Sequence, residues 1–341
     1  MQQDATNTAT EAVTASSPAW VETIDSTNEP TSLRDQLAVE LTAAIIAVHN
    51  DQPVVLVRRE TAPESGALDL LPSARFRPAV HTTLEHAMRE RVEEDTGLHL
   101  GFLEQLSSDC QRSLVTPEET RSHRSLSIGH LALSNAQSDE VVGDADWTSI
   151  YAYFPWEDWR AGRAAVLADT IQPRLAEWVE EDPEDTVAHH SLSRRERVAV
   201  AFGLDGGRWD DERVVERLDL LAESGLVNSG ADRIMRRDHR RILASALGRL
   251  RAKIRYRPVV FELLPRDFTL FELQKTVEAI LGPHLHKQNF RRLVEGTGLV
   301  EPTGDVRTHT GGRPAKLFRF RRDVLLERPA PGVRVRPARA V

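Results

Sequence analysis

Residues 269–295 read TLFELQKTVEAILGPHLHKQNFRRLVE, and this stretch decides the fold of the C-terminal part of the chain. Thr269 and Glu272 form a capping box pattern, in which the hydroxyl accepts from a backbone amide and the Glu side chain reaches back. Apolar residues then recur every three or four positions, as in an amphipathic helix. The Gly-Pro pair at 282–283 ends that helix in a tight turn and is well placed to open the next one, over 284–295. Two helices joined in this way predict a helix-turn-helix.

The second predicted helix has an apolar face and a polar, basic face. Leu285, Phe290 and Val294 lie on the apolar side. On the other side, Lys and Arg would contact phosphates, while Gln, Asn and Arg are the side chains that read base edges in a major groove. We therefore predict a DNA interface here. Its candidate residues are Lys287, Gln288, Asn289, Arg291 and Arg292, together with Thr269 at the start of the first helix.

A strand, a loop and a second strand follow the two helices. The first strand lies over 298–301 and meets a turn at 302–304, and the glycine-rich run 310–314 precedes a strand that ends at Phe320. Glycines let a backbone approach a phosphate closely, and an arginine at a loop tip can enter a minor groove. The pattern predicts a wing that adds Arg313 and Lys316 to the DNA contacts.

Charge is divided unequally between the two halves of the chain. Residues 1–188 contain 13 Lys and Arg against 33 Asp and Glu, whereas residues 189–341 contain 31 against 19. The overall net charge of −8 conceals this contrast. An acidic half joined to a basic half indicates a module that binds a polyanion, attached to a separate body.

Composition also excludes several classes of protein. The single cysteine, Cys110, excludes an intrachain disulfide framework and a cysteine-based zinc site, and it fits the cytosol. No apolar run approaches the ~18–20 residues of a membrane span. The first residues lack the basic and apolar regions of a secretory signal. We expect a cytoplasmic protein with no membrane segment.

The N-terminal half predicts a mixed α/β (α+β) sandwich. A helix over 84–95 is dense in helix formers and ends at Gly97, a residue suited to a left-handed cap. Strands and a helix in this order are typical of a sheet covered by helices. The other predicted elements are strands over 39–49, 54–57, 98–106 and 125–133, a mostly irregular segment over 61–78, and helices over 156–181, 191–202, 210–224 and 236–251.

The helix over 84–95 contains a charged pattern that resembles a Nudix box. Residues 89–98 read RERVEEDTGL, and the family pattern is G-x5-E-x7-R-E-U-x-E-E-x-G-U, where U is a bulky aliphatic residue. In that family, carboxylates on one helical turn hold Mg²⁺, which activates water to attack a pyrophosphate. A guanidinium among these ligands repels Mg²⁺, and Arg91 lies among them here. We therefore predict a ligand-binding relic of a hydrolase, with no catalytic residue and no metal.

The sequence can be aligned with the Nudix box pattern in two registers, and the sequence alone does not decide between them. Counting back from Gly97 puts Glu94 and Asp95 at the paired acidic positions and Arg91 where a metal-binding Glu belongs. A shift by one residue restores Arg89-Glu90 and Glu93-Glu94 but puts Arg91 at the aliphatic position. Neither register supplies the upstream Gly and Glu. The degenerate box comprises Glu90, Arg91, Glu93, Glu94 and Asp95, and our candidate ligand contacts are Arg58 and Arg112.

The two halves together resemble the Nudix-related transcriptional regulators of the NrtR family. The resemblance is close over 236–327 and loose over 39–181. It implies a homodimer that binds a palindromic operator in double-stranded DNA and represses genes of NAD biosynthesis or pentose metabolism. It also implies that ADP-ribose or a related nucleotide binds the Nudix-like domain as effector and causes release, with no cofactor. The runs that carry the resemblance are 261–265, 268–270, 285–292 and 311–320, and 154–160 is similar to an actinobacterial branch.

These observations divide the chain into five parts. We expect a disordered tail, a Nudix-like α/β/α sandwich, a helical connector, a winged helix-turn-helix and a flexible tail. Two other functions stay open: a Nudix hydrolase with a nucleic-acid-binding tail, and a constitutive DNA-binding protein whose Nudix-like half only dimerises. The expected boundaries are 1–32, 33–182, 183–235, 236–327 and 328–341.

Overall fold

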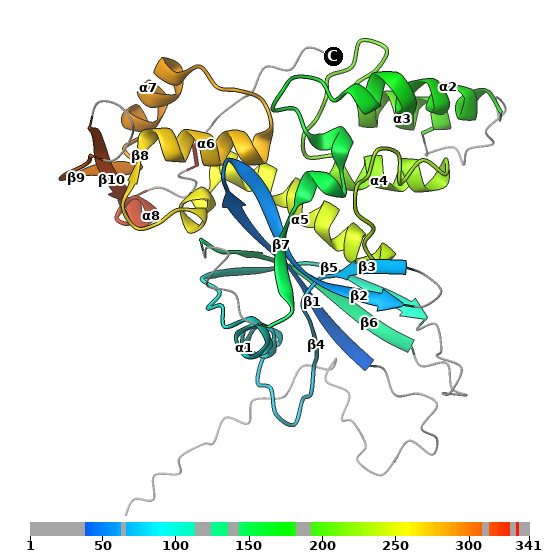
Figure 1. Cartoon of the computed structure of the whole chain (residues 1–341), viewed down its shortest axis with the longest axis horizontal. Coiled ribbons are helices and arrows are strands. Elements are labelled where there is room, and N and C mark those ends of the chain that lie inside the picture. Colours follow the sequence, from blue (N-terminus) through cyan, green and yellow to red (C-terminus); the bar gives the residue numbers. More distant parts are fainter. Residues whose placement is uncertain are drawn as a thin grey trace, which may run out of the picture.

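The computed structural model describes residues 38–62, 66–112, 124–135, 143–181, 192–308, 314–327 and 332–333. Within them, a seven-stranded mixed sheet forms the body of the molecule, with the central order β3-β2-β1-β6-β5 (Figure 1). Two short strands join it, because β4 pairs with β1 and β7 pairs with β2. The strands are β1 (Ala38–His49), β2 (Gln52–Ala62), β3 (Gly66–Leu70), β4 (Ser73–Arg75), β5 (Phe102–Arg112), β6 (Arg124–Leu133) and β7 (Ala145–Ser149).

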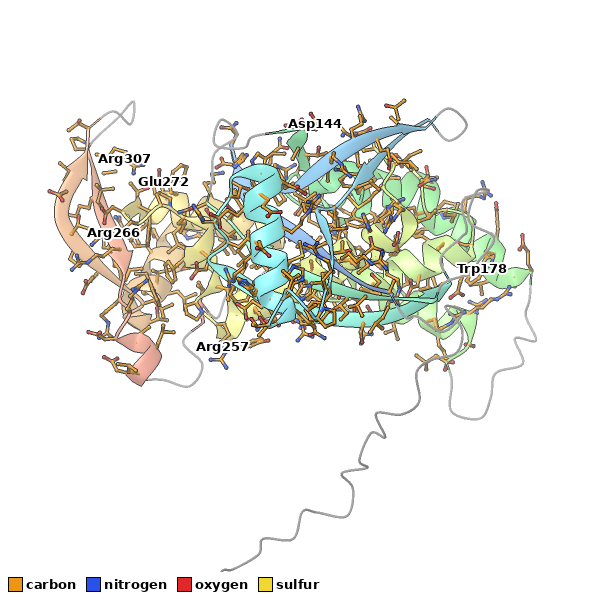
Figure 2. All side chains as sticks on the ribbon, turned by 90° about the horizontal axis from the view of Figure 1, so that it is seen from below. Asp144, Trp178, Arg257, Arg266, Glu272 and Arg307 are labelled. Atoms are coloured by element: carbon orange, nitrogen blue, oxygen red, sulfur yellow. The ribbon has the colours of Figure 1, made fainter. Side chains whose placement is uncertain are left out.

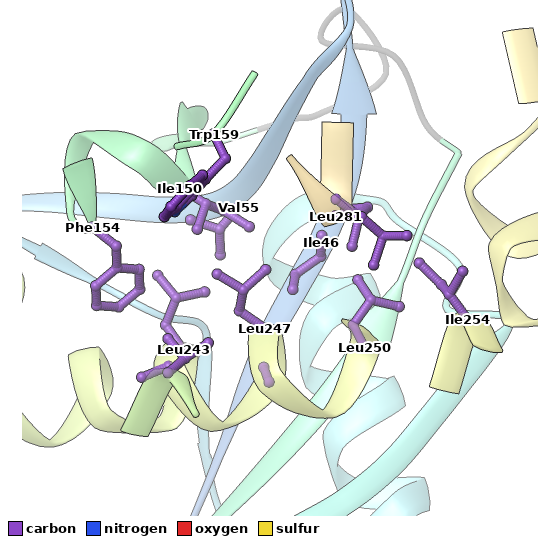
Figure 3. Close-up of a cluster of buried hydrophobic side chains, with 14 of the residues drawn as sticks. Ile46, Val55, Ile150, Phe154, Trp159, Leu243, Leu247, Leu250, Ile254 and Leu281 are labelled. Carbon is purple, nitrogen blue, oxygen red and sulfur yellow. The ribbon is translucent and has the colours of Figure 1, made fainter. Parts of the chain in front are cut away.

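Strand β1 lies at the centre of this sheet and is buried on both faces. It runs parallel to β6 and antiparallel to β2. Alternate side chains of a strand point to opposite faces. Leu41 and Ile45 accordingly join a cluster with Val92 of α1 (Leu84–Thr96), whereas Ile46 joins a cluster with Leu247 of α5 (Arg237–Tyr256) (Figure 3). The predicted sandwich class is confirmed.

Shorter helices continue the body beyond the sheet. The segment between α4 and α5 is tied to the sheet through Arg233, which donates two hydrogen bonds to Asp69, each at 2.7 Å. Asp69 also accepts a hydrogen bond from the Tyr153 hydroxyl at 2.6 Å. These elements are η3 (Ile150–Ala152), η4 (Pro155–Glu157), the π-helical turn η5 (Leu167–Ile171), α2 (Gln172–Glu180), α3 (Arg194–Phe202) and α4 (Val214–Glu223).

The C-terminal part is a winged helix. Strands β9 and β10 pair as an antiparallel wing, and β8 pairs with the other edge of β10. The wing is attached to the helices by an ion pair between Arg307 of β9 and Glu272 of α6 (Figure 2). Its elements are η6 (Val259–Leu263), β8 (Phe268–Thr269), α6 (Leu270–Leu281), α7 (Lys287–Thr297), β9 (Val300–Arg307), β10 (Ala315–Phe320) and α8 (Val324–Glu327).

Four expectations about the elements need correction. The segment 61–78 is not mostly irregular, because it contains β3 and β4, and the turn expected at 302–304 lies inside β9. The helix expected over 156–181 is interrupted, since α2 begins only at Gln172. The helix expected at the start of the winged helix domain is α5, which packs on β1, β5 and β6 of the large sheet as well as on α6. The expected tail at 1–32 lies outside the described residues, and the expected tail at 328–341 is described only at residues 332–333, where Val333 is buried and its amide donates to the Ile254 carbonyl at 3.0 Å.

Candidate functional site

The start of α6 is fixed by the predicted capping box. The Thr269 hydroxyl accepts from the Glu272 amide at 3.1 Å, and the Glu272 carboxylate accepts from the Thr269 amide at 2.8 Å. Thr269 is buried, with 6% of its surface exposed. Its side chain thus caps the helix and is almost entirely buried, and the contact of Thr269 with DNA stays a prediction.

The turn between α6 and α7 is fixed by buried polar groups. Glu278 accepts from the Leu285 amide at 2.9 Å and from the Gln274 amide group at 2.8 Å, and Gln274 also donates to the Leu285 carbonyl at 2.8 Å. Burial raises the pKa of the Glu278 carboxyl, but the hydrogen bonds from Gln274, Leu285 and His284 and the charge of Lys275 together hold the pKa below its ordinary value. An ionised Glu278 thus sets the angle at which α7 leaves α6.

Helix α7 presents the predicted polar face to solvent. Phe290 and Val294 are buried against the rest of the winged helix. Asn289 accepts a hydrogen bond from Arg292 at 3.2 Å, and Arg291 lies 3.6 Å from Glu295, so the two arginines stay on the outer surface. The exposed residues of this face are Lys287, Gln288, Asn289, Arg291 and Arg292.

The wing contributes one described candidate. Lys316 is exposed on β10, where it pairs in register with Val306 of β9. Arg313 lies outside the described residues, so its contact with DNA stays a prediction. Figure 1 shows helix α7 and the strands of the wing at the same end of the molecule.

The burial pattern of helix α1 fits the Gly97 register of the predicted Nudix-like box. Val92 and Leu98 are buried, as the two aliphatic positions of the Gly97 register require. Gly97 has φ of 71° and caps the helix in the left-handed conformation. Arg91 therefore occupies a position that a metal-binding Glu holds in an intact box. Its guanidinium lies 2.9 Å from Asp95, so it neutralises a carboxylate that a metal ion would need.

A cavity of about 400 Å³ lies beside this part of α1. Arg91, Glu94 and Asp95 line this cavity together with Arg58 of β2, whose contact with a ligand stays a prediction. The other two box residues point elsewhere: Glu90 lies 3.4 Å from His81, and Glu93 lies 3.3 Å from His99. The side chain of Arg112 lies outside the described part of the structure.

The start of α5 supplies two cavity residues that the sequence reasoning did not assign. Arg236 pairs with Glu40 at 3.4 Å, and both line the cavity with His239. Only 1% of the His239 surface is exposed, and its Nδ1 accepts from the Leu71 amide at 2.9 Å. Burial lowers the pKa of this imidazole to about 4, so it is neutral near pH 7. The helical sequence pattern around His239 does not indicate contact with Leu71, which lies between β3 and β4.

Neither a metal cluster nor a membrane helix is found among the residues that the structure describes. Within these ranges, no three His, Cys, Asp or Glu side chains gather closely enough to hold a metal ion. No helix of the described chain is both long and apolar enough to cross a bilayer.

Comparison with known proteins identifies the domain at residues 260–320, which matches the family described as the NrtR DNA-binding winged helix domain. The chain is 46% identical over 83 residues to the ADPR responsive transcriptional repressor NtrR of Acinetobacter baylyi, a match that covers 24% of this chain and 33% of that protein. The chain thus spans about a third of the length of this curated relative.

Two crystal structures match most of the length of this chain. Shewanella oneidensis NrtR complexed with a 27mer DNA matches with a TM-score of 0.50 and 21% identity, over 84% of this chain and 94% of that chain. A MutT/nudix family protein from Enterococcus faecalis matches with a TM-score of 0.49 and 15% identity, over 84% and 87%. Residues 260–320 thus form a winged helix domain of the NrtR DNA-binding type, and the fold of the chain is similar to that of Shewanella NrtR.

Proposed function

We propose that this chain is a cytoplasmic transcriptional repressor that binds operator DNA and releases it when ADP-ribose binds to the Nudix-like sandwich. One observation carries the proposal: helix α7 exposes a face of Lys, Gln, Asn and Arg side chains within a winged helix domain of the NrtR type. The Acinetobacter relative, whose printed name describes an ADPR responsive repressor, supports the same role and effector.

The DNA interface divides into two kinds of contact. In this proposal, α7 enters the major groove, where Gln288 and Asn289 read base edges. Lys287, Arg291 and Arg292 contact phosphates, with Lys316 and Arg313 of the wing reaching the adjacent backbone. A homodimer would place two such helices on a palindromic operator. The regulated genes would belong to NAD or pentose metabolism.

The cavity beside α1 is the proposed effector site. Arg58 and Arg236 offer guanidinium groups, which bind phosphates in a planar, two-pronged geometry, and a pyrophosphate carries the matching charge. Arg91 and its ion pair with Asp95 favour binding without hydrolysis, because they remove the cluster of free carboxylates that would hold Mg²⁺. We therefore propose a sensor and not a pyrophosphatase.

The DNA half of the proposal predicts a change in salt dependence. Arg291→Ala and Arg292→Ala should each weaken binding to the operator and lower the slope of log affinity against log salt by about 1, because each removes one phosphate contact. Fluorescence anisotropy at several salt concentrations measures both quantities. Arg174→Ala changes an exposed arginine of α2, far along the chain, and serves as a control. A salt slope that stays the same in both α7 variants would contradict the assignment of the recognition helix.

A further inference from the structure

Helix α6 is buried almost all round, yet its one fully exposed position carries a phenylalanine. Nine of its twelve residues are buried, while Glu272 and Lys275 are half-buried. Phe271 leaves 54% of its surface in water. A position of this kind normally carries a polar side chain. The aromatic ring there offers an apolar contact to another molecule.

The surroundings of the ring are cationic. The Lys275 ammonium lies 5.7 Å and the Lys287 ammonium 5.9 Å from the centre of the Phe271 ring, within the range of a cation–π contact. Lys287 is the first residue of α7, so the ring lies beside the N-terminus of the recognition helix. Lys275 is also 3.4 Å from Glu278, the residue that fixes the turn between the helices. The Lys275 ammonium is thus held by Glu278 and by Asp51 of the turn between β1 and β2, which lies 3.7 Å away.

We propose that Phe271 packs against an apolar part of the DNA, a deoxyribose or the methyl group of a thymine, while Lys287 contacts the neighbouring phosphate. This inference rests on the proposed function and adds α6 to an interface otherwise assigned to α7 and the wing. DNA fits the patch better than a protein does. A protein partner would have to desolvate two ammonium groups along with the ring, whereas DNA supplies phosphates for them and apolar edges for the phenyl group.

The test separates apolar contact from charge. Phe271→Ala should raise the dissociation constant for the operator about tenfold and leave the salt slope unchanged, because no charge is lost. Phe271→Leu should recover most of the affinity. Lys287→Ala should lower the salt slope by about 1. Leu326→Ala removes a side chain of α8 that is 91% exposed and is the matched control, with unchanged affinity. Circular dichroism and the thermal midpoint establish that each variant is folded.

Replacing each thymine of the operator with deoxyuracil distinguishes the two apolar partners. If Phe271 contacts a thymine methyl group, the replacement at one operator position should weaken binding of the wild type and should not change binding of the Phe271→Ala variant. If Phe271 contacts a deoxyribose, no position should behave in this way. The inference is wrong if Arg292→Ala weakens binding and Phe271→Ala does not. It is also wrong if Phe271→Ala changes the oligomeric state in size-exclusion chromatography and not the affinity for DNA. A wild-type chain that binds no specific DNA contradicts the proposed function as well.

Discussion

His239 is a histidine that the fold keeps neutral. Its Nδ1 accepts from the Leu71 amide, so the proton of the neutral ring lies on Nε2, for which the described residues offer no hydrogen-bond acceptor. Burial is the main cause of its low pKa, and the charge of Arg236 adds to it, while Asp238 acts in the opposite direction. Protonation would break the bond to Leu71 and place a charge in the core between the sheet and α5.

This arrangement predicts an acid sensitivity with a defined sign. The pKa of His239 is about 4 in the folded chain and 6.5 for an ordinary histidine, so between these values the unfolded chain binds the extra proton. Its contribution to the free energy of unfolding is complete above pH 6.5 and falls as the pH falls towards 4.

His239→Asn keeps an acceptor for the Leu71 amide and removes the titration. We expect the slope of the free energy of unfolding against pH, measured by urea denaturation between pH 4 and 6.5, to fall by up to about 1.4 kcal/mol per pH unit in this variant. Buried His130, whose pKa is also lowered, should still contribute in the variant. An identical pH dependence in wild type and variant would show that His239 is not the group responsible.

At the scale of elements, α5 shows why local propensity is a poor guide to a packed helix. Gly248 lies in the interior of α5, where propensity alone predicts that alanine would stabilise the helix by about 1 kcal/mol. However, a Cβ at Gly248 would lie 2.6 Å from the Glu212 carbonyl oxygen, which belongs to the segment before α4. The glycine is therefore required by the close approach of another part of the chain.

Gly248→Ala should consequently destabilise the chain, by about 1–3 kcal/mol, as overpacking of a core does. Gly296 of α7 provides the matched control, because a Cβ there would meet nothing within 4 Å. Gly296→Ala should be neutral or stabilise the chain by up to about 1 kcal/mol. The midpoints of thermal unfolding measure both changes. A stabilised Gly248→Ala variant would mean that the segment before α4 moves aside without cost.

The sequence predicted elements well where their signals are local. The capping box at Thr269, the left-handed cap at Gly97 and the polar face of α7 follow from neighbouring residues, and the structure confirms each of them. Strands β3 and β4 were missed, because proline and glycine interrupt their short apolar runs and pairing with β2 and β1 decides their conformation. The sequence did not indicate that Arg236 and His239 line the cavity beside α1, since they reach it from a part of the chain far from α1.

At the scale of the molecule, α5 joins the cavity to the winged helix. Its first turn carries Arg236 and His239, and Arg251 lies about 18 Å further along the helix axis. Arg251 is fully buried, donates to the Ile280 carbonyl of α6 at 2.9 Å and pairs with buried Glu157 at 2.5 Å. Leu281 of α6 packs in the same core as Leu247 of α5 (Figure 3). A ligand that displaces the start of α5 would therefore act on the helix that positions α7.

The most direct test of this account is the release of DNA by ADP-ribose. Fluorescence anisotropy on DNA from upstream of the protein's own gene, with Mg²⁺ present, should show specific binding that ADP-ribose reverses while the nucleotide is recovered intact. The variant Arg58→Ala, altered only in the cavity wall, should bind the same DNA and resist release. Specific binding that ADP-ribose does not affect, hydrolysis of the nucleotide, or no specific binding at all would contradict the account.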